Sequence, residues 1–268
     1  MGGDCSNHNA AVISIIARSL LEGLERGDTV LSVPSALQPV FGELDFQRLR
    51  AFSGFISKVQ HNYLWETFPH SRALLEAWAI ELDAFAEYRL RYPPLRPERL
   101  NRQQKMARVV GFLEEYLERP HAPSCPGLKD VLRHERIEWE LKEMHAGETA
   151  RLPHQYGDRA YPKLSNHAQL ARFNYDPLDI IAQMSTPVPP RVKRRRCYRC
   201  YVIDFSAGEL RSFELSWPAW SFLGRMDGRR SIAGLLAKSD SERQREFRGL
   251  LLQASDMGIV TMLESSAA

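Results

Sequence analysis

Apolar residues recur at steps of three and four through the first half of the chain, which is the spacing of helices that each bury one face. Proline and glycine interrupt this pattern and set its boundaries. The predicted helices cover residues 10–24, 49–63, 75–85 after a cap at Ser71, 106–116 between Pro97 and Pro120, and 128–144. This order predicts an all-helical bundle over residues 1–150.

One carboxylate falls on the apolar stripe of the last of these helices. Glu135 lies among Leu128, Val131, Leu132 and Trp139, and at about 100° per residue its side chain points the same way as theirs. A buried charge needs a compensating donor. We therefore expect an arginine of a neighbouring helix to pair with this glutamate.

The composition changes after the helical half. Residues 146–196 are rich in Pro, Gly and Tyr, with short helices predicted over 164–173 and 177–183. The run at 185–190, Ser-Thr-Pro-Val-Pro-Pro, favours an extended chain. We interpret residues 151–196 as a connecting segment that ends in a Pro- and Arg-rich linker.

Beyond this linker the apolar period becomes that of a β-hairpin. The pattern predicts a strand over 198–205, a turn at 206–209 and a second strand over 210–215. Three helices and a last strand are predicted to follow, over 217–226, 232–237, 241–257 and 259–262. Residues 197–264 should therefore form a winged-helix-like module. The predicted fold class is mainly α, with an α+β module at the C-terminal end.

Composition narrows the class of protein. Apolar residues make up 44% and charged residues 26% of the 268 residues, as in folded globular proteins. The net charge of +3 does not by itself indicate a nucleic-acid binder. Four unevenly spaced cysteines argue against a disulfide scaffold, and no apolar run is long enough to span a membrane. We expect a cytoplasmic protein with no membrane partner.

Two groups of potential metal ligands have unsuitable spacing. His134, Glu138 and His145 share one side of a helix. At 1.5 Å per residue the two histidines are about 16 Å apart, too far to bind one ion. Cys197 and Cys200 form a C-x-x-C in a predicted strand, where positions three apart face opposite sides. No metal is therefore expected in this chain.

The sequence lacks the common catalytic motifs. It contains no P-loop, dinucleotide fingerprint or G-x-S-x-G elbow, which favours a binding role over an enzyme. The basic run at 193–196 could contact phosphates beside a winged helix, so a DNA-binding regulator is the alternative. The third helix argues against nucleic acid because it alternates both charge signs, as on a solvated face. The alternating residues are Glu242, Arg243, Arg245, Glu246 and Arg248.

Two sets of segments resemble known families. FELSWPAWSFLGRMDGRRSIAGLLAKS and FRGLLLQASDMGIVTM, within residues 213–262, resemble the pyrroloquinoline-quinone-D-like recognition module of systems that modify ribosomal peptides. FPHSRALLEAW, FLEEYL, LKDVLRHERIEWEL and FNYDPLDII resemble the helical domain of partner proteins of multinuclear non-haem iron-dependent oxidative enzymes. This family includes the partners for methanobactin and 3-thiaglutamate biosynthesis. Together the resemblances cover most of residues 44–263.

The resemblance implies an accessory subunit with no catalytic residues and no cofactor. It would hold the leader or carrier peptide while a TIM-barrel partner enzyme, which carries the iron, modifies a peptidyl cysteine. A full helical domain joined to a complete module is more similar to the 3-thiaglutamate partner. That similarity implies oxidative excision of the β-carbon of a C-terminal cysteine.

The hairpin suggests how such a peptide would bind. An extended peptide can add as a strand beside residues 210–215 and pack against the third helix, whose arginines could pair with acidic residues of the peptide. On the hairpin, Arg211 and Phe213 should share one face. The expected peptide-binding residues are Leu210, Arg211, Ser212, Phe213, Glu214, Leu215, Arg245 and Arg248.

Overall fold

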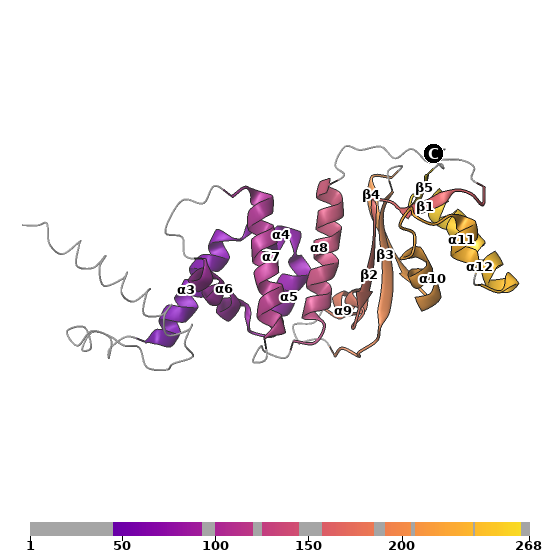
Figure 1. The fold of residues 1–268 in the computed structure, drawn as a ribbon. Helices are drawn as coiled ribbons and strands as arrows, with labels where there is room; N and C mark the ends of the chain where they lie inside the picture. The colour runs from indigo at the N-terminus through magenta and orange to yellow at the C-terminus, as the bar shows by residue number, and fades with distance from the viewer. Residues whose placement is uncertain are drawn as a thin grey trace, which may run out of the picture. The chain divides into compact units, whose positions relative to one another are not determined.

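The computed structural model describes residues 45–92, 100–119, 125–144, 157–184, 191–204, 207–237 and 239–263 (Figure 1). The chain forms two compact units, residues 1–124 and residues 125–268. The helix predicted over 10–24 and the proline run at 185–190 lie outside the described residues. Within the described ranges, no helix has the length and apolar character needed to cross a membrane.

The described part of the first unit is helical, as its apolar period predicts. It contains α3 (Phe46–Gln60), α4 (Tyr63–Thr67), α5 (Pro69–Ala77), α6 (Glu81–Arg91) and α7 (Arg102–Glu118). Asp45 caps α3 by accepting from the backbone N–H of Arg48, and Asn101 and Gln104 form a capping box at α7. α6 packs against α3, α5 and α7.

The helix predicted over 75–85 is in fact two helices. α5 ends at Ala77, and Ala79 has a left-handed φ of 54°, through which a right-handed helix cannot continue. Ser71, the predicted cap, is buried inside α5, which begins with Pro69. The prediction is wrong here because Leu75, Leu82 and their apolar neighbours keep helical spacing across the break.

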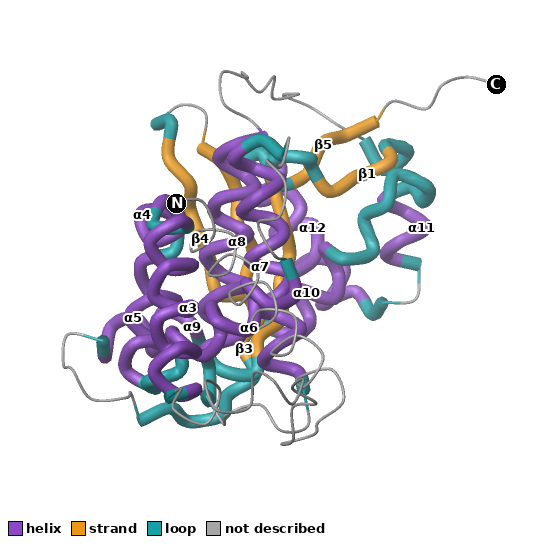
Figure 2. The backbone as a smooth tube through the Cα atoms, turned by 90° about the vertical axis from the view of Figure 1, so that its left-hand side faces the viewer, coloured by secondary structure: helices purple, strands orange, loops and turns teal. Residues whose placement is uncertain are grey.

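The second unit combines helices with two small antiparallel sheets. Its elements are α8 (Leu128–Met144), β1 (Tyr161–Leu164), β2 (Ala168–Phe173), α9 (Pro177–Gln183), β3 (Cys197–Asp204), β4 (Glu209–Leu215), α10 (Trp217–Leu223), α11 (Ile232–Leu236), α12 (Ser241–Asp256) and β5 (Val260–Leu263). The larger sheet has the order β2-β3-β4, and β1 pairs with β5. Figure 2 shows β1 and β5 as a separate pair at the upper right.

The three-stranded sheet is covered on both faces. On one face Cys197 and Tyr201 of β3 pack with Ile137 and Leu141 of α8. On the other face Cys200 belongs to a core that includes residues of α10, α11 and α12. Figure 1 shows α8 and α10 on opposite sides of the strands. β3 is therefore the central strand of a sandwich of helix, sheet and helices.

Residues 164–173, predicted as a helix, form the end of β1, a turn and β2. In β2, Ala168 faces the core with α10 to α12, whereas Ala171 and Phe173 face α8. A strand buried on both faces loses the simple alternation of apolar and polar residues. Ala, Gln, Leu and Arg are also good helix formers, so local propensity favoured the wrong element.

The boundary between the units differs from the predicted boundaries at 150 and 196. α8 belongs to the second unit, and residues 157–184 supply β1, β2 and α9 to it. Residues 157–184 of the predicted connecting segment are thus part of a folded unit rather than a spacer. The bounds of α8 are those predicted, and Glu135 is buried within it. Its pairing with an arginine of a neighbouring helix stays a prediction.

Candidate functional site

β4 is an edge strand with one open side. It pairs with β3 from Asp204↔Glu209 to Tyr198↔Leu215. Among the described residues, the backbone of β4 has no hydrogen-bond partner other than β3. In an edge strand, alternate residues direct their N–H and C=O groups outward. This side of the sheet can therefore accept another strand.

The opposite edge of the sheet is closed at its end by α8. Asp130 accepts hydrogen bonds from the backbone N–H groups of Asn174 and Tyr175, just after β2. Arg133 donates to the carbonyl oxygen of Arg172, in β2 itself, at 3.3 Å. Burial raises the pKa of Asp130, against the lowering effect of the two backbone donors. Among the described residues, the end of the β2 edge thus receives hydrogen bonds from α8 side chains, whereas the outer edge of β4 receives none.

The side chains of β4 alternate between the two faces as predicted. Leu210 packs on the α8 side, whereas Phe213 and Leu215 pack on the opposite core. By the same alternation Arg211 shares the face of Phe213, and its guanidinium lies 2.7 Å from Asp204. The strand therefore presents partly buried apolar side chains on both faces.

Arg245 and Arg248, the two arginines of the third helix predicted to bind the peptide, have different environments. Arg248 of α12 pairs with Asp158, with one of its two contacts at 3.0 Å, so an acidic peptide would have to displace that carboxylate. Arg245 has no ion-pair partner among the described residues. Arg245 is thus the more available of the two for a peptide.

A network of arginines and carboxylates lies at the end of β4, where β3 begins. Arg199 Nη2 donates to the two carboxylate oxygens of Asp176, at 2.9 and 3.2 Å. Arg195 reaches the same carboxylate at 2.5 Å and also donates to Glu214 of β4 at 2.8 Å. Asp176 also caps α9 by accepting from the N–H of Leu178. One buried carboxylate therefore joins α9, β3 and the residues before β3.

The charge state of Asp176 follows from these contacts. Burial by itself would raise its pKa. Hydrogen bonding to Arg199, the charge of that residue, the N–H of Leu178 and the charge of Arg195 outweigh burial, and the pKa lies below its usual range. Asp176 is therefore an anion at neutral pH, and sequence reasoning did not identify it.

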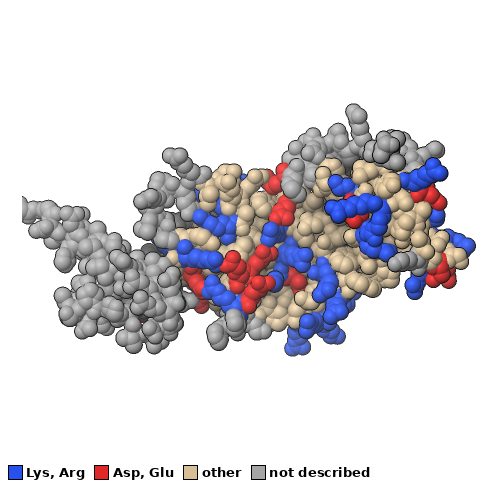
Figure 3. Space-filling view, in the orientation of Figure 1, with Lys and Arg blue, Asp and Glu red and all other residues tan. Residues whose placement is uncertain are grey.

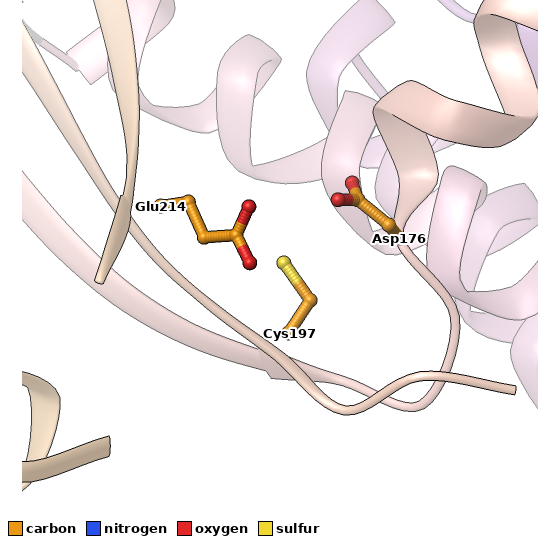
Figure 4. A group of neighbouring side chains, drawn as sticks. All are labelled: Asp176, Cys197 and Glu214. Carbon is orange, nitrogen blue, oxygen red and sulfur yellow. The ribbon is translucent and has the colours of Figure 1, made fainter. Parts of the chain in front are cut away.

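Asp176, Cys197 and Glu214 also bring three potential metal-ligand atoms within 4.8 Å of one another (Figure 4). Both carboxylates, however, already accept hydrogen bonds from Arg195, and Asp176 accepts from Arg199 as well. A cation placed here would stand beside two guanidinium groups and would have to displace them. We therefore assign these carboxylates to the ion-pair network.

The two cysteines of the C-x-x-C face opposite sides of β3, as predicted. Burial, with a smaller effect of Asp176, raises the pKa of Cys197 to about 11. Burial raises the pKa of Cys200 to about 12. Because thiolates are the reactive species, both thiols should react poorly.

We expect iodoacetamide at pH 8 to label Cys197 and Cys200 very slowly in the folded protein. Less than about one thousandth of each thiol is ionised at three pH units below its pKa. Peptide-resolved mass spectrometry measures the rates, and labelling in guanidinium chloride is the control. Rapid labelling of either cysteine in the folded state would contradict the buried positions in β3.

His134 makes a buried contact between α8 and β3. Its Nδ1 lies 2.7 Å from the hydroxyl oxygen of Tyr201, and both residues are buried between α8 and β3. Its Nε2 lies 3.5 Å from Glu138. His145 lies outside the described residues. The tyrosine partner comes from a strand distant in sequence and could not be found from helical spacing.

No protein-family model and no curated protein sequence matches this chain.

Proposed function

We propose that this chain is a peptide-binding partner subunit. It holds a leader or carrier peptide as an added strand on β4 while a separate iron-dependent oxidase modifies that peptide. The open outer edge of β4 carries this proposal, because unpaired peptide groups on an edge strand are a template for an extended chain. The partly buried side chains of β4 offer contacts for alternate side chains of such a peptide.

The order of elements supports a recognition module of the pyrroloquinoline-quinone-D-like kind. Three antiparallel strands, β2, β3 and β4, are followed by α10, α11 and α12. We assign β2 as the first strand of this winged-helix-like module, so the module begins before the linker. The helix α8 is an addition that covers the face of the sheet opposite α10.

The iron-containing partner is inferred from the resemblance of the helical segments to partner proteins of multinuclear iron oxidases. In this proposal the present chain supplies no cofactor and no catalytic group. It raises the effective concentration of a cysteine at the partner's iron by tethering the peptide elsewhere. The proposed reaction of the partner is excision of the β-carbon of a C-terminal cysteine, which requires that end of the carrier to remain free.

DNA binding through α12 is less well supported. Arg243 lies 3.7 Å from Asp240, and Arg248 pairs with Asp158. Glutamates 242 and 246 are exposed on the same helix. A recognition helix needs cations free to approach phosphates and bases. This helix offers mixed charges instead.

The test is to select binders from a displayed library of random peptides against the full chain and to synthesise one with single N-methylated peptide bonds. If the peptide adds to β4, methylation at alternate residues should weaken binding, by about 2- to 10-fold for each hydrogen bond lost. Methylation at the intervening residues should have little effect. Hydrogen exchange should slow at residues 209–215, and β5 serves as the internal control strand.

Two results would count against this function. The first is that no peptide of the library binds the full chain. The second is that the bound peptide protects the first unit or β5 from exchange but leaves β4 unchanged. Either outcome would remove the reason to call β4 a peptide-binding edge.

A further inference from the structure

A row of exposed cations precedes β3. Arg191, Lys193, Arg194 and Arg196 are all exposed, and within the described ranges none of them has an ion-pair or hydrogen-bond partner. We call these four residues the basic ridge. Figure 3 shows blue side chains projecting from the second unit at the end of the sheet where β3 begins in Figure 1. The strand-addition site described above does not account for them.

The basic ridge is anchored by Arg195, whose side chain is 50% exposed but is held by two carboxylates. The N–H of Arg195 donates to the carbonyl oxygen of Asn174 at 2.9 Å, and its side chain pairs with Asp176 and Glu214. Its neighbours on both sides, Arg194 and Arg196, remain exposed. Arg195 is thus the ion-paired residue of this segment, and the four cations of the ridge are exposed without such a pair among the described residues.

The basic ridge lies next to the end of β4. Tyr198 is opposite Leu215, and Arg196 precedes Tyr198 by two residues. At a rise of about 3.3 Å per residue, the ridge begins roughly 7 Å beyond Leu215. A chain on the outer edge of β4 runs about 10 Å from the line of β3, two strand spacings away. About two or three residues past Leu215 it is level with the ridge, and the gap is one that long arginine and acidic side chains together can span.

The direction of pairing decides which part of a peptide reaches the ridge. The sheet is antiparallel throughout, and antiparallel pairs are the more stable per residue. A peptide that adds antiparallel to β4 has its N-terminal side at Leu215. We propose that the basic ridge binds acidic residues that lie just N-terminal to the strand-forming segment of the peptide. This inference rests on the proposed strand addition at β4.

The surroundings of the ridge favour an acidic peptide over nucleic acid. Glu214 and Asp179, with side chains 46% and 67% exposed, stand at the base of the ridge beside Arg195. A nucleic-acid backbone needs a broad basic face, and these carboxylates would repel adjacent phosphates. A peptide can place two or three carboxylates among four cations and avoid the acidic side.

The experiment repeats the selection from random dodecapeptides on two forms of the full chain. One is the natural chain and the other is the ridge variant Lys193→Ser, Arg194→Ser, Arg196→Ser. The matched control is Lys163→Ser, Arg229→Ser, Arg230→Ser, which removes the same charge from exposed positions elsewhere in the unit. The N-methylation pattern of each selected peptide identifies its strand-forming segment.

In peptides selected on the natural chain and on the control, we expect Asp and Glu to be enriched just before the strand-forming segment. Peptides selected on the ridge variant should lack this enrichment. Changing these acids to Asn and Gln should weaken binding to the natural chain by about tenfold at low salt, as for several exposed ion pairs together. The same change should have a much smaller effect on binding to the ridge variant, in which Arg191 is the one ridge cation left. Acid enrichment after the segment, or equal affinity of both forms for the acidic peptide, would overturn the proposal.

Two further outcomes separate this inference from the proposed function. Suppose that N-methylation at alternate residues weakens binding of the selected peptides, but replacement of their acidic residues does not. That result would refute the role of the ridge and leave strand addition at β4 in place. A 20-base-pair DNA duplex that binds through the ridge more tightly than the selected peptides at physiological salt would also refute it, because the partner would then be nucleic acid. Failure to select any strand-adding peptide would refute both.

Discussion

Replacing Asp176 by Asn should lower the free energy of unfolding by about 3–5 kcal/mol, the usual effect of removing one partner from a buried ion pair. The asparagine can still accept from the N–H of Leu178, so the cap of α9 is retained. What is lost is the negative charge beside Arg199, whose side chain is 7% exposed. Urea denaturation followed by circular dichroism measures the change.

Asp179→Asn is the matched control for this substitution. Asp179 lies 3.6 Å from Arg195 but is 67% exposed, so its loss should change stability by less than about 1 kcal/mol. Equal effects of the two substitutions would show that burial of the Asp176 pair does not matter. An unchanged stability of Asp176→Asn would contradict the ion-pair network itself.

The contribution of this network to the free energy of unfolding should decrease at acidic pH. The pKa of Asp176 is lower in the folded protein than its ordinary value of about 3.9. Its stabilising contribution is therefore complete above pH 4 and is lost as the pH falls through the folded pKa. Asp176→Asn should lack this acid-sensitive component. Asp130 has the opposite effect on stability. Its pKa is raised in the folded protein, so protonation of its carboxylate at low pH stabilises the folded state.

Gly54→Ala should destabilise the first unit, although alanine is the better helix former. A Cβ atom at Gly54 of α3 would lie 2.1 Å from the carbonyl oxygen of Leu82 in α6. Both atoms belong to helix backbones that cannot move independently. Overpacking of this kind costs about 1–3 kcal/mol, more than the roughly 1 kcal/mol that alanine contributes in a helix. Thermal unfolding measures the difference.

Gly111→Ala provides the control of opposite sign. Gly111 lies within α7, and a Cβ atom there meets nothing within 4 Å. This substitution should raise stability by up to about 1 kcal/mol through helix propensity alone. If both alanines stabilise the protein, α3 and α6 are farther apart at Gly54 than the structure places them.

Local patterns predicted those elements whose stability depends on one buried face or on a cap. The bounds of α8 were predicted as observed, and Ser216 and Asp240, which directly precede the helices predicted from 217 and 241, cap α10 and α12. β2 was missed because both of its faces are buried and its residues favour helices. The break at Ala79 was missed because apolar spacing continues across it. The spacing of apolar residues indicates which side chains are buried, but it does not indicate where the backbone changes direction.

The candidate site could be predicted in part. The hairpin of β3 and β4 was evident from its alternating residues, and the run at 193–196 was evident from its charge. The choice of the open edge depends on β2, which the sequence did not reveal as a strand. The role of Arg195 depends on Asp176, a residue 19 positions away. Contacts of this range are set by the sheet and leave no local signal.

The sheet takes β2 from before the proline run and β3 and β4 from after it. This arrangement restricts how the fold can be inherited. A gene fragment that begins at Cys197 would encode β3 and β4 without β2, and without the helix that covers Phe173 and Tyr201. Its product would expose the apolar face that α8 now buries. Recombination that exchanges the second unit between proteins must therefore cut near residue 125, well before the linker that divides the sequence by composition.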